Sequence, residues 1–119
     1  MGTVTGQLVV PQEGPTVKGT RAAVRIRDIT LSDAPAPTPV AETTMVVDVA
    51  PRAHIPFSVD VPDEALGRVA ENKLSLNLEA HVDLDGSGTF SRGDLVSLTA
   101  QPIGPESPGT PLEVPLSTV

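Results

Sequence analysis

The sequence predicts an all-β fold: a small antiparallel β-sandwich of about seven short strands, with one short helical turn near residues 63–70. Three observations predict it. Apolar and polar residues alternate in several short runs with the two-residue period of a strand. Thirteen prolines and ten glycines divide the 119 residues into short pieces, which suits many turns. The apolar residues are mainly Val, Leu, Ile and Ala, with Phe57 and Phe90 as the only aromatic residues, so the core must be built largely from aliphatic side chains that favour strands.

Four of the expected strands lie in the first half of the chain. In the second of them, alternate residues from Ala22 to Ile26 face inward, while Arg21, Arg25 and Arg27 project to water. A loop with three prolines follows it and cannot pair regularly, because proline lacks a backbone donor. The four expected strands are residues 4–10, 20–30, 45–49 and 55–61.

The second half begins with a helical start at Pro62, Asp63 and Glu64, because proline and acidic side chains suit the first turn of a helix. The clearest alternation in the chain follows at 74–82, and a returning strand is expected at 95–101. The pattern fades after Pro102. We therefore expect a single domain over residues 1–102 and a Pro/Gly-rich tail over residues 103–119, extended or mobile.

Charge and composition exclude several classes of partner. The net charge of −7 disfavours nucleic acid and anionic membrane surfaces, which bind Lys and Arg. The chain has no Trp or Tyr to stack on bases and no Cys for a disulfide or a thiolate metal site. No apolar run is long enough to insert into a bilayer, and the sequence as written has no secretory signal. Localisation stays open between a cytoplasmic protein and a trimmed exported domain.

Residues 83–94 have the spacing of an EF-hand calcium loop, with Gly88 at the sharp turn in position 6. Asp94 at position 12 is one methylene shorter than the usual Glu, so we expect weak Ca²⁺ binding, with a dissociation constant on the order of 10⁻⁴–10⁻³ M. The alternative is a polar turn, because Asp-Gly and Ser-Gly pairs are common turn formers. The sequence leaves both open. The expected ligands are Asp83, Asp85, Ser87, Ser91 and Asp94 through their side chains and Thr89 through its carbonyl.

The remaining polar residues give weaker indications. His54 and His81 are expected to be inert, with His81 solvated on the polar face of its strand. The arginine stripe of Arg21, Arg25 and Arg27 is either a solvated face paired with nearby carboxylates or a contact surface for an acidic partner. The sequence contains no nucleophile elbow and no phosphate-binding loop. We therefore expect no enzymatic activity.

Several segments resemble the YbaY/YscW-type lipoprotein domain. They are Val4-x-Gly6, then Ala22-x-Val24-x-Ile26-x-Asp28, then residues 31–36 (Leu-Ser-Asp-Ala-Pro-Ala), and the Ile55-Pro56-Phe57 element. The resemblance covers roughly residues 3 to 102. It implies a β-sandwich without enzymatic activity, and in the type III secretion members a pilotin-like chaperone of outer-membrane secretins. The chain departs from the family because it has no lipobox cysteine.

Two functional hypotheses follow. The first is a non-enzymatic binding or chaperone-like β-sandwich that holds a protein or peptide partner through a sheet edge, with the calcium loop as an accessory. The second is a structural or cell-surface module that calcium stiffens and that has no specific partner.

Overall fold

The computed structural model describes residues 2–30, 39–84, 93–97 and 101–118. These residues form an all-β domain with one α-helix and one short 3₁₀ helix, which confirms the predicted fold class. The strands are β1 (Gly2–Val9), β2 (Val17–Asp28), β3 (Ala41–Val49), β4 (His54–Val61), β5 (Leu76–Asp83), β6 (Leu95–Ser97), β7 (Pro102–Ile103) and β8 (Leu112–Thr118).

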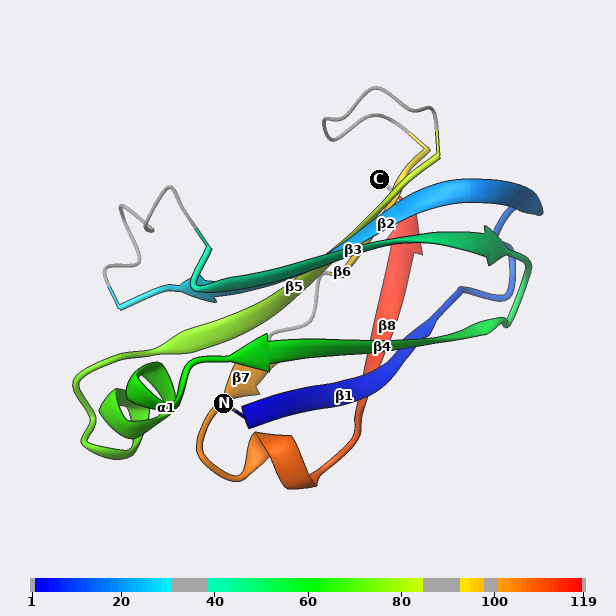
Figure 1. The fold of residues 1–119 in the computed structure, drawn as a ribbon. Helices are drawn as coiled ribbons and strands as arrows, with labels where there is room; N and C mark the ends of the chain where they lie inside the picture. The colour runs from blue at the N-terminus through cyan, green and yellow to red at the C-terminus, as the bar shows by residue number, and fades with distance from the viewer. Residues whose placement is uncertain (1, 31–38, 85–92, 98–100, 119) are drawn as a thin grey trace.

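The strands join in one continuous sheet in the order β3-β2-β5-β6-β8-β1-β4, and β7 pairs with β5 beside this path. The sheet curls over, so that the layer of β1 and β4 faces the layer of β2, β3 and β5, and β8 runs between them (Figure 1). The arrangement is therefore barrel-like, because β8 connects the two layers that a sandwich would keep apart. All pairs are antiparallel except β1 with β8, which is parallel.

The core lies between the two layers and is aliphatic, as the composition indicates. Each layer contributes the inward residues of its alternating strands, because successive side chains of a strand point to opposite faces. Phe57 of β4, 6% exposed, is the aromatic residue that the described part of the chain places in this core. The central β2 and β5 contribute Ala22, Val24, Ile26, Leu76, Leu78, Ala80 and Val82, and the facing layer contributes Val4, Leu8, Ile55, Phe57, Val59 and Val61.

The α-helix, α1 (Asp63–Ala70), begins after Pro62 as predicted. Asp63 and Glu64 occupy its first turn, where the helix dipole favours negative charge. Gly67 lies inside the helix and does not interrupt it. No helix among the described residues is long and apolar enough to cross a membrane.

The prediction of a C-terminal tail after residue 102 is wrong, because β8 lies inside the sheet. Its first half pairs with β1 and its second half with β6, and Val114 and Leu116 are buried in the core. The sheet tolerates Pro115 because this residue lies where β8 changes partners: it is the last residue paired with β1, and the ladder to β6 begins at Leu116. The prolines of this segment therefore do not keep it out of the sheet.

Candidate functional site

The face of β2, β5 and β6 that points away from the core is strongly polar; we call it the outer face. On β5 it carries Asn77, Glu79, His81 and Asp83, which alternate with the core residues. On β2 it carries the arginines of the predicted stripe. Two groups of polar side chains lie on this face.

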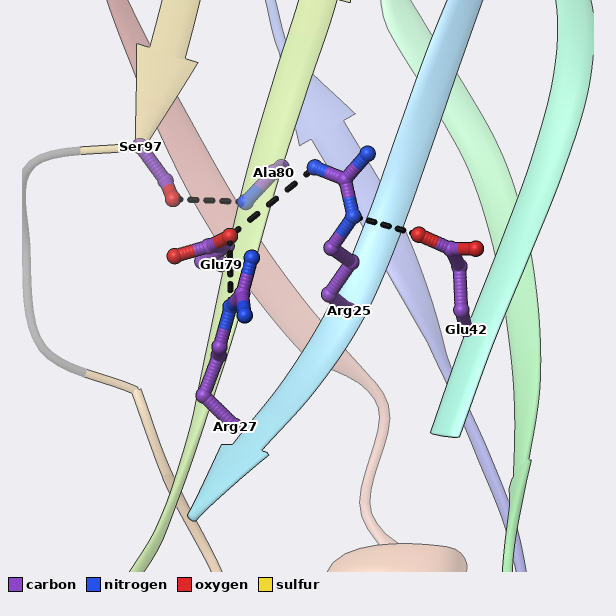
Figure 2. A network of polar contacts seen from close by, with 6 residues as sticks. All are labelled: Arg25, Arg27, Glu42, Glu79, Ala80 and Ser97. Carbon is purple, nitrogen blue, oxygen red and sulfur yellow. Dashed lines mark hydrogen bonds and ion pairs between the residues drawn. The ribbon is translucent and has the colours of Figure 1, made fainter. Parts of the chain in front are cut away.

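The first group is an arginine–glutamate network (Figure 2). The register places Arg25 between Glu42 of β3 and Glu79 of β5, and it pairs with both. Arg27 Nε lies 3.0 Å from Glu79 Oε1. Carboxylates of the sheet itself thus neutralise two of the three arginines. This pairing supports the first of the two interpretations of the arginine stripe, a solvated face paired with nearby carboxylates, over a contact surface for an acidic partner. Arg21 is exposed at the other end of the strand.

The second group contains a buried histidine and two aspartates. His81 Nε2 lies 2.8 Å from Asp94 Oδ2, and the two side chains are only 7% and 1% exposed. The expectation that His81 is solvated is therefore wrong. Alternation correctly places its side chain on the polar face, but the neighbouring β6 brings Asp94 and Val96 beside it.

The third member, Asp83, lies at the end of β5 and is 8% exposed. The register pairs His81 with Val96 and Val82 with Leu95, so the next two positions are Asp83 and Asp94. Thr20 Oγ1 donates to the Asp83 carbonyl oxygen over 2.6 Å and fixes this end of β5 to β2. One ligand atom from each of His81, Asp83 and Asp94 lies within 4.8 Å of the others.

The structure describes only the two ends of the predicted calcium loop. Asp83 and Asp94, at positions 1 and 12, are brought together. Asp85, Ser87, Thr89 and Ser91 lie outside the described residues. Both oxygens of Asp94 already have protein partners, because Oδ1 accepts the Leu84 N–H over 3.0 Å and Oδ2 contacts His81. Sequence reasoning missed His81; its signal is the His81-x-Asp83 spacing, which places both side chains on one face of a strand.

The open edges of the sheet lie at β3 and β4, the two ends of the strand order. A shallow groove between them, which we call the seam, is lined by Thr43, Met45, Pro56, Phe57 and Ser58. On the opposite side of β3, Val46 is 75% exposed. An extended chain could pair with either edge, but Pro56 removes one backbone donor from β4.

Comparison with solved structures gives a likeness over nearly the whole chain. An alternative pilotin from the type II secretion system of Vibrio cholerae superposes with a TM-score of 0.74, covering 98% of this chain and 96% of that one at 16% identity. The fold is pilotin-like. No protein-family model and no curated protein matches the sequence, so the narrower resemblance to YbaY/YscW proteins stays a prediction.

Proposed function

We propose that this pilotin-like protein is a non-enzymatic, chaperone-like binding domain that holds an extended segment of a partner protein along the open edge of β3. The likeness to a pilotin supports a role in binding another protein. A single observation carries the choice of β3. It is a nine-residue strand at the end of the sheet, with one edge paired to β2 and the other open within the described part of the chain.

Edge strands of natural proteins are normally protected by proline, lysine or a bulge, because their unpaired backbone groups accept another strand. The β3 sequence contains neither proline nor lysine, and its register to β2 shifts once, between Val17 and Thr20, and is regular from Thr20 to Ile26. Val46 instead exposes an apolar side chain there. These features favour addition of a strand from a partner, in which backbone hydrogen bonds give affinity and side chains give specificity.

Charge defines the chemistry of that partner. Asp48 lies on the same face of β3 as Val46, Glu42 on that face is already paired with Arg25, and the whole chain carries −7. The complementary segment is therefore extended, apolar at alternate positions and basic between them. Electrostatic attraction of this kind speeds association and excludes acidic competitors.

The test is selection of binders from a random peptide library, followed by affinity measurement against Val46→Lys. We expect selected peptides to alternate apolar and basic residues, and Val46→Lys to weaken binding at least tenfold, because a lysine on an edge strand is charged and opposes a basic partner. Ala70→Lys, which adds the same charge at an exposed position at the end of α1, serves as the control and should bind like the wild type.

Equal loss of affinity in both variants would mean that the change in net charge alone weakens binding. Unchanged binding by Val46→Lys would mean that the peptide binds elsewhere. A protein that selects no peptide but gains protease resistance with Ca²⁺ would instead support the calcium-stiffened module.

A further inference from the structure

We propose that His81, Asp83 and Asp94 bind a divalent transition metal of the Zn²⁺ type at the junction of β5 and β6. This site is independent of the β3 edge. It rests on three ligand-bearing side chains that the strand register gathers on the outer face, with ligand atoms within 4.8 Å of one another.

The donor set selects the class of metal. Imidazole nitrogen together with carboxylate oxygen is typical of Zn²⁺ and its first-row neighbours, whereas Ca²⁺ and Mg²⁺ take oxygen ligands almost exclusively. The calcium prediction from the sequence used only oxygen donors. The buried imidazole of His81 lies beside Asp94 and adds a nitrogen donor to the cluster. This donor favours a transition metal over Ca²⁺.

The His81–Asp94 distance fits with a small movement, whereas the Asp83 ligand atom, within 4.8 Å of the others, has to approach by up to about 1.5 Å. Ligands about 2.0–2.1 Å from a tetrahedral Zn²⁺ are roughly 3.3 Å apart. His81 Nε2 and Asp94 Oδ2 are 2.8 Å apart, so they need to separate by only a fraction of an ångström to share an ion. Three protein ligands leave the fourth position of a tetrahedral site for water.

The surrounding contacts orient the ligands. The Leu84 N–H donates to Asp94 Oδ1, which turns the other oxygen toward His81, in the way that backbone donors commonly hold metal-binding carboxylates. Thr20 anchors the backbone of Asp83 from the neighbouring strand. His81 and Asp83 thus lie on β5, which the sheet ladder fixes, and Asp94 directly precedes β6.

Electrostatics favours a cation at this place. Two carboxylates next to each other and almost buried repel strongly in a low-dielectric environment. A divalent ion between the aspartates balances both charges at once.

The test is titration of the full chain, after dialysis against EDTA, with ZnCl₂ by calorimetry and with CoCl₂ by visible absorption. The absence of Cys means that no thiolate ligand can bind the added ion. We expect one equivalent to bind and ligand-field bands to appear with Co²⁺. Asp83→Asn and His81→Gln should each weaken binding by more than about tenfold, with circular dichroism confirming that both variants stay folded.

His54→Asn is the matched control, because His54 is exposed and bonded to Gln7 at the far side of the sheet. It should bind Zn²⁺ like the wild type, and only the His81 imidazole should shift in NMR spectra. The proposal is overturned if micromolar Zn²⁺ does not bind, if Asp83→Asn and His81→Gln bind as tightly as the wild type, or if His54→Asn alone loses the ion. Preference for Ca²⁺ over Zn²⁺ would also overturn it, in favour of the oxygen-only loop.

Discussion

At the scale of single residues, the environment of a side chain depends on a neighbour that lies far away in sequence or in another strand. His81 occupies a polar position of an alternating strand, yet it is 6% exposed because β6 places Asp94 beside it. Arg25 and Arg27 occupy similar positions and pair with Glu42 and Glu79. Alternation gives the direction of these side chains, whereas the adjoining strand decides their partners.

Thr30 shows how one hydroxyl can tie two strand ends together. Its Oγ1 donates to Asp28 Oδ1 over 2.6 Å at the end of β2 and accepts the Ser75 N–H before β5. The Thr30 backbone N–H also donates to Asp28. These hydrogen bonds, first that of the side chain and then that of the backbone, hold the pKa of Asp28 below its ordinary value.

We expect Thr30→Val to raise the pKa of Asp28 toward its ordinary value, measured by NMR titration of the carboxyl carbon. A lowered carboxyl pKa stabilises the fold above the unfolded-state pKa, and that contribution disappears as pH falls through the folded-state pKa. The variant should therefore lose most stability near neutral pH; the difference from the wild type should shrink in acid to the part that comes from the lost Ser75 hydrogen bond. Thr44→Val, on exposed β3, should leave Asp28 unchanged. A Thr30→Val protein with the wild-type Asp28 titration would contradict this explanation.

At the scale of elements, the sequence predicted most strands from their alternation, but it did not indicate which strands pair. The alternating run of Leu74 to Val82 appears as β5, and the predicted helical turn appears as α1. The parallel pairing of β1 with β8 was not expected, because β8 lies beyond the predicted end of the domain. The register of this pair places Gly6 opposite Leu112.

Two glycine substitutions distinguish the close approach of β1 and β8 at Gly6 from the general effect of a glycine on the backbone entropy of the unfolded chain. A Cβ on Gly6 would lie 2.3 Å from the Leu112 carbonyl oxygen, so Gly6→Ala must push β8 away from β1. We expect it to destabilise the protein by about 1–3 kcal/mol. Gly67 in α1 has open space around its Cβ position, so Gly67→Ala should stabilise by about 0.5–1 kcal/mol.

Urea denaturation followed by far-ultraviolet circular dichroism measures both values, since the chain has no Trp. Equal stabilisation by the two alanines would mean that β1 and β8 do not approach closely at Gly6.

At the scale of the whole molecule, β8 connects the two layers of the sheet. It pairs with β1 on one side and β6 on the other, and it buries Leu116 in the core. The connection between the two layers therefore depends on the segment that the sequence analysis assigned to a tail.

Leu116→Ala tests this role. A buried leucine leaves a cavity when truncated, so we expect a loss of about 2–5 kcal/mol of unfolding free energy. Glu113→Ala, an exposed change on the same strand, should stay within about 0.5 kcal/mol of the wild type. Denaturant titration compares the two. An independent tail would make both substitutions neutral.

The candidate site was predictable only in part. The spacing of Asp83 and Asp94 indicated that these residues belong together, and the register of β5 and β6 brings them to adjacent positions. His81 was left out, because the loop pattern counts oxygen donors along the chain and does not include the strand that precedes it. The remaining loop positions lie outside the described residues, and their calcium ligation stays a prediction.

The sequence by itself determined the all-β class, the aliphatic core and the start of the helix. Each follows from local chemistry: the two-residue period of strands, the scarcity of aromatics, and proline with acids in a first turn. Only the tertiary structure decided that β8 joins the two layers of the sheet, that β3 is left as an open edge, and that His81 meets Asp94. A period of two fixes which face a side chain takes, but long-range burial of apolar surface selects the neighbouring strand.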